Sequence, residues 1–343
     1  MSKINSSTAI VVVTYKRKEL LKVLFDSYLA STVYPGNIYI VDNDKDPEVG
    51  DMCRHLQENL RANVAAVGNS EDGSHADSTP MSPSVNYIPM ETNTGGAGGF
   101  SKGVESAYKA GAEWIWVMDD DVKVLPHGLE TLEKWMKDAV ADDHRVIQCR
   151  RMNYDDTPFY WQYHFWNKLG IPNPVAPADF KPGETQRPMN TACFEGGLFH
   201  RSIVDEIGIP DNRFFIYWDD TVYGYLASKV TNPILVVDIL MQRTRHIDNI
   251  KIGSARKLNS TSDMVRYYIM RNRGYIAHYL KLNGEYNPII FGFGTFLTFS
   301  KETIRLVITK NFRQGMASIT RGMKDGKIAR RDKTWKPMKE IQD

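Results

Sequence analysis

Short apolar runs alternate with helix-forming segments over the first part of the chain. Ala9 to Val13 is continuously apolar and mostly β-branched, which is typical of a parallel strand buried on both faces. Further strands are predicted at Ile38 to Val41, around Tyr87-Ile88 and at Trp114 to Met118. Helices are predicted between these strands, at residues 20–28, 49–60 and 101–110. This alternation predicts an α/β sheet with right-handed crossovers.

The pattern becomes less regular outside these elements. Residues 69–84 are rich in Ser, Asp, Pro and Gly without an apolar period, so we expect a long exposed loop. A strand at Ile234 to Val237 precedes a polar segment, and the chain beyond about Ser262 is predicted to be helical. We therefore expect a catalytic α/β domain over residues 1–255 and a basic helical region over residues 256–343.

Polar residues follow several of the predicted strands. In such sheets, ligands bind outside the carboxyl ends of the strands. Thr14-Tyr15, Asp42-Asn43 and Asp119-Asp120-Asp121 occupy that edge. Neighbouring carboxylates repel each other unless a cation balances them, and in an extended segment Asp119 and Asp121 point the same way. This arrangement favours a hard divalent ion shared with diphosphate oxygens, although a solvated acidic turn or a helix cap is an alternative.

A second acidic pair follows an apolar segment at Trp218-Asp219-Asp220. One of its carboxylates could act as a general base toward an acceptor hydroxyl while the other orients it. Asp219 could instead cap the helix predicted at residues 221–228. Trp218 offers an apolar face to a sugar, or simply fills the core. His246 could complete a metal site begun by the aspartates, although a surface histidine is the alternative.

Glycines are concentrated at two places. Gly95-Gly96-Ala97-Gly98-Gly99 precedes a predicted helix and permits close backbone approach to a diphosphate or a sugar; a flexible turn is the alternative. The run does not match the dinucleotide or P-loop patterns. Gly196-Gly197, after Glu195, is a similar candidate for contact with an acceptor hydroxyl.

Charge is distributed unevenly along the chain. The whole chain carries a net charge of +2, which indicates neither a nucleic-acid-binding protein nor an acidic one. From Phe291 onward, twelve Lys or Arg face five Asp or Glu, so the tail carries +7 and the remainder −5. The tail also contains an apolar stretch, Ile289 to Thr298. We therefore expect it to meet an anionic membrane surface, with a solvated basic helix as the alternative.

Cysteine spacing and hydropathy bear on location. Cys53, Cys149 and Cys193 are far apart and form no CxxC pair, so we expect free buried thiols rather than disulfides or a zinc site. The apolar stretch at Ala9 to Val13 is too short for a signal peptide, and Tyr286 to Ser300 is shorter than the ~20 residues that cross a bilayer. A cytoplasmic protein, peripheral on the inner face of the membrane, is expected.

Taken in order, these segments resemble a known family. Val12 to Arg17, Val41 to Asn43, Asn93 to Phe100, Met118 to Asp121 and Trp218 to Asp220, followed by His246, resemble inverting family-2 glycosyltransferases of GT-A fold. The glycine-rich segment, the three aspartates and the Trp-Asp-Asp are similar to bacterial galactofuranosyltransferases, with rhamnosyltransferases nearby. The resemblance covers roughly residues 8–250.

The resemblance implies roles for individual residues. Asp119, Asp121 and His246 would hold Mn²⁺ or Mg²⁺ against the donor diphosphate, and Asp220 would be the catalytic base, assisted by Asp219. The nucleotide sugar would be bound by Thr14, Tyr15, Arg17, Asp42, Asn43, Asn93, Gly98, Gly99, Lys102 and Asp119. The acceptor would contact Trp218, Glu195, Gly196 and Gly197.

The implied reaction moves galactofuranose from UDP-galactofuranose to a lipid-linked or polysaccharide acceptor in cell-surface glycan synthesis. Rhamnosyl transfer from dTDP-rhamnose is one alternative, and a catalytically silent module that recruits a glycan assembly is another. A nucleotidylyltransferase would need glycines beside the basic segment Lys16 to Lys18, and none accompany it. The similar galactofuranosyltransferases can carry N-terminal sandwich domains, whereas this chain begins at its first strand, so processive polymerisation is not expected.

Overall fold

The largest element of the fold is a ten-stranded mixed sheet. A computed structural model of the chain describes residues 3–68, 83–159, 164–173, 179–246, 249–252, 256–259 and 261–338. In this sheet, the four strands predicted at the N-terminal end pair in parallel, in the order β3-β2-β1-β4. Their bounds are β1 (Lys3–Thr14), β2 (Val33–Asp42), β3 (Ser84–Pro89) and β4 (Trp114–Asp119).

One antiparallel strand joins this parallel block to a second one. β11 pairs antiparallel with both β4 and β6, while β6 and β12 run parallel to each other. Short strands pair along β6 and β12, and β13-β14 and β8-β9 form two small separate sheets. The bounds are β5 (Val122–Val124), β6 (Val146–Met152), β7 (Pro158–Phe159), β8 (Phe165–Trp166), β9 (Ile171–Pro172), β10 (Gln186–Pro188), β11 (Gly197–His200), β12 (Ile234–Arg243), β13 (Asn249–Ile252) and β14 (Arg256–Asn259). The predicted α/β class with a mostly parallel sheet is confirmed.

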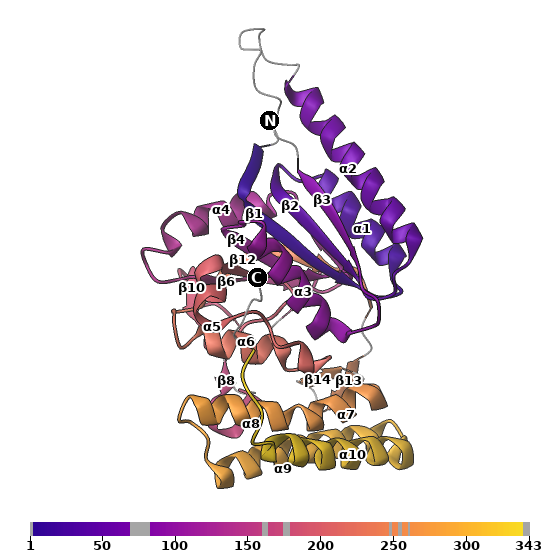
Figure 1. Cartoon of the computed structure of the whole chain (residues 1–343), viewed down its shortest axis with the longest axis vertical. Coiled ribbons are helices and arrows are strands. Elements are labelled where there is room, and N and C mark those ends of the chain that lie inside the picture. The colour runs from indigo at the N-terminus through magenta and orange to yellow at the C-terminus, as the bar shows by residue number, and fades with distance from the viewer. Residues whose placement is uncertain are drawn as a thin grey trace.

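Helices cover both faces of the large sheet (Figure 1). Ile10 and Val12 of β1 belong to a core shared with α1, α2 and α4, whereas Ala9, Val11 and Val13 belong to a core shared with α3, α5 and α6. This burial on both faces explains why the segment Ala9 to Val13 of β1 is continuously apolar. The helix bounds are α1 (Lys18–Leu29), α2 (Pro47–Gly68), α3 (Gly95–Lys109), α4 (Gly128–Ala139), α5 (Arg201–Ile207) and α6 (Asp219–Ala227).

The glycine run lies inside α3 rather than before it, which corrects the predicted helix start at Ser101. A Cβ on Gly99 would lie 2.5 Å from Val13 Cγ1, and one on Gly103 would lie 2.2 Å from Val11 Cγ1. These glycines therefore let α3 pack closely against β1. The glycine run was expected to let the backbone approach a ligand closely, but at Gly99 the close approach is to the sheet.

Two further predictions concern segment ends. Residues 69–82 of the predicted exposed loop lie outside the described residues, and Ser84 belongs to β3. The helix predicted at residues 221–228 begins at Asp219, so its N-cap is Trp218 and not Asp219. The three cysteines are free and buried, as predicted.

The C-terminal part is helical, as expected, and forms a layer at the far end of the molecule from α2 (Figure 1). Its helices are α7 (Asp263–Arg271), α8 (Arg273–Leu282), α9 (Pro288–Ile308) and α10 (Phe312–Arg331). Phe214, Tyr225, Ile276 and Phe291 belong to one apolar cluster that joins this layer to α6. None of the helices in the described ranges combines the length and hydropathy needed to cross a membrane. The boundary proposed at residue 255 falls where residues 253–255 are not described.

Candidate functional site

The candidate site lies at one edge of the large sheet, where functional side chains from several strands meet. β1, β2, β4, β6 and β12 run in the same direction, so their carboxyl ends share an edge. β11 runs the opposite way and therefore begins at that same edge. Thr14, Asp119, Arg151 and Arg243 lie at or next to strand ends, and Glu195 lies just before β11. The topology thus gathers residues that are far apart in the sequence.

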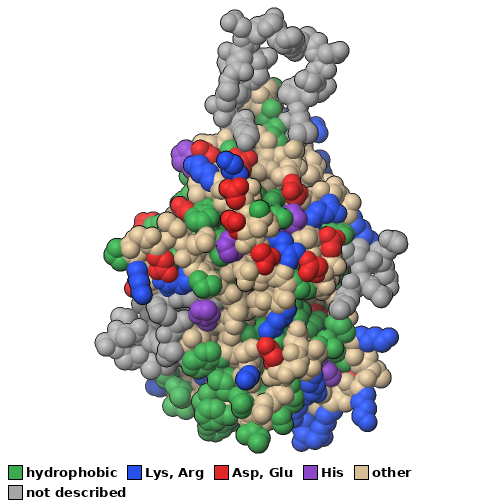
Figure 2. Space-filling view, turned by 90° about the vertical axis from the view of Figure 1, so that its left-hand side faces the viewer, with side chains coloured by type: hydrophobic (Ala, Val, Ile, Leu, Met, Phe, Trp, Pro, Cys, Tyr) green, Lys and Arg blue, Asp and Glu red, His purple; other side chains and the backbone are tan. Residues whose placement is uncertain are grey.

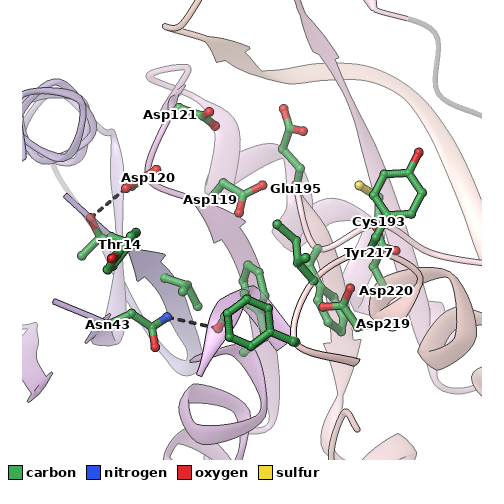
Figure 3. A pocket seen from close by; sticks show the side chains of 18 of the residues that line it. Thr14, Asn43, Asp119, Asp120, Asp121, Cys193, Glu195, Tyr217, Asp219 and Asp220 are labelled. Carbon is green, nitrogen blue, oxygen red and sulfur yellow. Dashed lines mark hydrogen bonds between the residues drawn. The ribbon is translucent and has the colours of Figure 1, made fainter. Parts of the chain in front are cut away.

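A cavity of about 680 Å³ opens at this edge (Figure 3). Most of the predicted site residues line it, namely Thr14, Tyr15, Arg17, Asn43, Asn93, Asp119, Asp121, Glu195, Trp218, Asp219 and Asp220. Gly95, Gly96 and Asp120 line it as well. The acidic run and the second acidic pair therefore face one common space.

Other predicted residues do not line this cavity. They are Asp42, Gly98, Gly99, Lys102, Gly196, Gly197 and His246. The buried Asp42 carboxylate accepts hydrogen bonds from the backbone N–H groups of Asp44 (2.9 Å) and Asp46 (2.8 Å) and from the Tyr87 hydroxyl (3.0 Å). Asp42 therefore shapes the turn after β2, while its neighbour Asn43 reaches the cavity. The ligand-binding roles of these seven residues stay predictions.

The acidic run changes direction at its first residue, because β4 ends at Asp119 and the next two residues form a turn. Asp120 is buried and accepts hydrogen bonds from the Thr14 hydroxyl (2.7 Å) and Arg17 Nη1 (2.9 Å). Arg17 Nη1 also lies 3.2 Å from Asp121 Oδ2. The extended segment assumed for these residues is a turn, but Asp119 and Asp121 still point to the same side, toward Glu195, whereas Asp120 points toward Thr14 (Figure 3).

These carboxyls are held at an electrostatic disadvantage. Burial, and then the charges of Asp121 and Glu195, raise the pKa of Asp119 well above its ordinary value. Burial also raises the pKa of Asp120 and Asp121, and the nearby Arg17 guanidinium only partly opposes that rise. A carboxylate whose ionised form is disfavoured by its surroundings gains from an added cation. Asp119 and Asp121 therefore fit one or two of the oxygen ligands that Mn²⁺ or Mg²⁺ takes alongside phosphate and water.

His246 does not line the cavity. It is exposed, and its ring packs edge-on against Tyr154 with centroids 4.5 Å apart. Two residues earlier, the Thr244 N–H donates to the Asp121 carbonyl at 2.8 Å, so the segment runs beside the acidic turn. The described residues contain no group of three His, Cys, Asp or Glu side chains that could hold a metal. The role of His246 as a metal ligand stays a prediction.

The second acidic pair follows a strained segment. Phe215, Tyr217 and Trp218 have φ values of +63°, +73° and +76°, a region that non-glycine residues rarely adopt. The fully buried Asn272 holds this segment, because its Nδ2 donates to the carbonyls of Phe214 (3.0 Å), Ile216 (2.9 Å) and Tyr217 (2.8 Å). The buried Trp218 donates from Nε1 to the Ile269 carbonyl at 3.2 Å. The strain is thus held by α7 and the α7–α8 junction, which places Asp219 and Asp220 at the start of α6.

Both members of this pair have a raised pKa. Burial, followed by repulsion from Asp220, raises the pKa of Asp219 to about 8. Burial also raises the pKa of Asp220, although Thr221 opposes the rise: its N–H and hydroxyl lie 2.5 and 3.1 Å from Asp220 Oδ1. A carboxylate with a raised pKa is a stronger base than an ordinary one. The pair is therefore suited to accept a proton from a hydroxyl group.

Sequence reasoning missed two arginines of the site. Arg243 binds Glu195 with both arms of its guanidinium, at 2.6 and 2.7 Å, and Arg151 Nε lies 2.8 Å from Glu195 Oε1. Burial alone would raise the pKa of Glu195, but Arg151 and Arg243 hold it below the usual value. All three side chains line the cavity. Their position in the sequence could have identified them, because both arginines lie at or next to the carboxyl ends of strands, as Asp119 does.

Comparison with known proteins agrees with this geometry. The profile of glycosyl transferase family 2 matches residues 9–208. The chain is similar to the galactofuranosyltransferase GlfT1 of Mycolicibacterium smegmatis, with 28% identity over 281 residues that cover 78% of this chain and 81% of the relative. It is also similar to GlfT1 of Mycobacterium tuberculosis, with 28% identity over 275 residues, covering 78% and 80%.

The fold is also shared with a solved structure. The S. aureus TarS fragment 1–349 in complex with UDP-GlcNAc matches with a TM-score of 0.56 and 14% identity, covering 94% of this chain and 81% of that one. This likeness shows the GT-A glycosyltransferase fold. Since the profile matches more than half of the chain, from the first strand past the acidic run and Glu195, the protein belongs to glycosyl transferase family 2.

Proposed function

We propose that this glycosyltransferase moves galactofuranose from UDP-galactofuranose to a hydroxyl of a lipid-linked or polysaccharide acceptor, with inversion at the anomeric carbon. The observation that carries the proposal is that one cavity is lined both by the acidic run of the sheet edge and by Asp219 and Asp220. The likeness to the two galactofuranosyltransferases GlfT1 supports the choice of sugar. Both relatives are covered over about four fifths of their length.

The donor would lie against the sheet edge. Thr14, Tyr15, Arg17, Asn43 and Asn93 line the part of the cavity formed by β1, β2 and the start of α3. Asp119 and Asp121 would hold Mn²⁺ or Mg²⁺, which when bound neutralises charge that builds up on a departing diphosphate. Arg17 keeps Asp120 and Asp121 in place, at 2.9 and 3.2 Å.

The acceptor would approach from the side of α6. The Asp220 carboxylate accepts the proton of the acceptor hydroxyl while the oxygen of that hydroxyl forms a bond to the anomeric carbon. The bond from that carbon to the diphosphate oxygen breaks on the opposite face, and UDP leaves. Asp219, the neighbouring residue at the start of α6, assists by positioning Asp220. Arg151 and Arg243 fix Glu195 for contact with a substrate hydroxyl.

The test is transfer from UDP-galactofuranose with Mn²⁺ to a panel of lipid-linked and saccharide acceptors, beside dTDP-rhamnose and with EDTA as control. We expect EDTA-sensitive product from UDP-galactofuranose only. Product from dTDP-rhamnose alone would keep the mechanism and overturn the sugar. Product of retained configuration would overturn the single displacement.

The proposed function includes a partner, an anionic membrane surface bound by α9 and the start of α10. One face of α9 is buried along Phe291, Gly294, Thr298, Glu302 and Arg305. The opposite face of α9 exposes a stripe of large apolar side chains, which Phe312 at the start of α10 continues. The stripe consists of Ile289 (82% exposed), Phe293 (56%), Phe296 (60%), Ile304 (50%), Val307 (63%) and Phe312 (51%).

Cations flank this apolar stripe. Lys301, Lys310 and Arg313 are exposed on or beside it. At the end of the molecule formed by α9 and α10, hydrophobic side chains gather beside Lys and Arg side chains (Figure 2). Apolar residues that enter the lipid interface and cations that face anionic headgroups together form an interfacial element.

Sedimentation with vesicles tests this partner. We expect binding to phosphatidylglycerol vesicles, weakened by salt, and much less binding to phosphatidylcholine vesicles. The double variant Phe293→Ser and Phe296→Ser should lose binding, whereas Val140→Ser, an exposed apolar residue after α4, should not. Concentration-dependent dimerisation that the double variant abolishes, without vesicle binding by the parent, would assign the stripe to a second copy instead.

A further inference from the structure

A second cavity lies between α3, the short 3-10 turn Asn212–Phe214 and α7. Its volume is about 440 Å³, and Phe215 lines both this cavity and the first one. Three cations line it, Lys102 from α3, Arg213 from the turn and Arg271 from α7. The strained segment before the catalytic pair therefore has a cationic cavity beside it.

The three cations differ in how their charge is balanced. Lys102 pairs at 3.2 Å with Glu105, which also lines the cavity, and Arg213 pairs with Asp211 at 2.6 Å. Arg271 donates from Nη2 to the carbonyls of Arg213 (2.6 Å) and Phe214 (2.8 Å) and from Nε to Asn272 Oδ1 (2.8 Å), and no carboxylate among the described residues pairs with it. A partly buried guanidinium whose partners are neutral retains a charge that an anion would balance.

Aromatic and apolar groups complete the lining. Tyr268 stacks on Phe215, with ring centroids 4.8 Å apart and planes 16° from parallel, and the Arg271 guanidinium lies 4.7 Å from the Tyr268 centroid. Met90 and Ile209 add aliphatic surface. The guanidinium Nη1 of Arg271 and the ammonium group of Lys102 suit phosphate oxygens, and the apolar surface suits the carbon part of an ester.

We propose that the second cavity binds a phosphate ester belonging to the acceptor, so that the acceptor spans Phe215 between this cavity and Asp220. This inference rests on the proposed transfer to a lipid-linked acceptor and names its anionic group. Lys102 then contacts the acceptor's phosphate and not the donor diphosphate. The strained segment from Phe215 to Trp218 would be the wall between the two cavities.

Direct binding tests the cavity without requiring turnover. The probe is octyl phosphate, titrated by calorimetry into the full chain with UDP and Mn²⁺ saturating the first cavity, beside inorganic phosphate. We expect octyl phosphate to bind more tightly than inorganic phosphate. Arg271→Gln and Lys102→Glu should each weaken octyl phosphate about tenfold, as loss of a charge-assisted hydrogen bond does.

Lys109→Glu is the matched control, because Lys109 also pairs with Glu105, at 3.3 Å, but does not line the cavity. It should change octyl phosphate affinity less than about twofold. Arg271 also supports the loop through its bonds to the carbonyls of Arg213 and Phe214, so thermal unfolding checks that Arg271→Gln is folded. If Arg271→Gln is unfolded, Lys102→Glu alone decides the test. UDP affinity should stay unchanged in Lys102→Glu.

Three results would overturn the proposal. Equal affinity for octyl and inorganic phosphate would indicate a free-phosphate site, and equal affinity in the parent and Lys102→Glu would place the anion elsewhere. Loss of UDP binding in Lys102→Glu would return that lysine to the donor. Failure of galactofuranosyl transfer with octyl phosphate binding intact would overturn only the proposed function. Galactofuranosyl transfer without octyl phosphate binding would overturn only this inference.

Discussion

The two acidic groups of the cavity have similar composition but different surroundings. Asp120 and Asp121 at the sheet edge contact the Arg17 guanidinium, and Asp119 faces Glu195. Asp220 at the start of α6 instead accepts hydrogen bonds from the N–H and hydroxyl of Thr221. Three clustered carboxylates with one neighbouring guanidinium favour a further cation, whereas burial raises the proton affinity of the second pair even though Thr221 donates to Asp220. Similar residues thus suit metal binding in one place and proton transfer in the other.

The largest expected effect comes from neutralising the proton acceptor. Asp220→Asn preserves shape but cannot take the hydroxyl proton, so we expect kcat to fall by about 10³-fold or more. UDP affinity with Mn²⁺ should stay within about twofold, since the donor lies at the other group. Steady-state kinetics and UDP titration check both values, with the exposed Asp51→Asn of α2 as control. Retained turnover would remove Asp220 from the role of base.

A smaller effect is expected at the sheet edge. Asp121→Ala removes a proposed metal ligand, so UDP affinity in Mn²⁺ should fall at least about tenfold, with no difference from the parent in EDTA. Calorimetric titration measures this, with the exposed Asp142→Ala as control. An equal loss of UDP affinity with and without the metal would show a structural role instead.

The pH dependence separates the two groups further. Burial raises the pKa of both carboxyls of the pair, and repulsion from Asp220 adds to the rise at Asp219, to about 8. Protonation of Asp220 removes the base, so kcat should fall about tenfold per pH unit below an apparent pKa that lies above the ordinary carboxyl value of ~4. A profile of kcat at saturating Mn²⁺ and donor tests this. An apparent pKa at or below that ordinary value would contradict it.

The smallest effect concerns the support of the base. Thr221→Val removes the hydroxyl that donates to Asp220 at 3.1 Å while keeping the side-chain shape. That bond favours the ionised carboxylate, so its loss should raise the apparent pKa of the acid limb by up to about one unit, with little change in the plateau kcat. Superimposed profiles of the parent and the variant would show that the backbone N–H alone supports Asp220.

Much of the sheet and many residues of the site could be predicted from sequence. The four N-terminal strands and the helices between them follow from local periodicity, because burial on both faces leaves a continuous apolar run such as Ala9 to Val13. Thr14, Asn43 and Asp119 could be assigned to one edge, since parallel strands place their carboxyl ends together. Arg151 was missed because its strand was not predicted, and Arg243 because the strand predicted at Ile234 to Val237 continues as far as Arg243, although the same rule applies to both.

Other features depended on long-range packing. The helical state of the glycine run follows from the approach of α3 to β1, and a local pattern of glycines favours a turn equally well. The strained backbone from Phe215 to Trp218 is held by Asn272, more than fifty residues later in the chain. Such contacts leave no local signal in the sequence.

The sequence by itself determined the α/β class, the order of the polar strand ends and the presence of two acidic groups, because these follow from periodicity and strand direction. Only the tertiary structure decided which carboxylate meets Arg17, that Glu195 lies between two arginines, and that Lys102 and Arg271 line a second cavity. The physical reason is that the pKa and the partner of a charged group depend on burial and on neighbours a few ångströms away. Those neighbours come from elements that the chain brings together only when it folds.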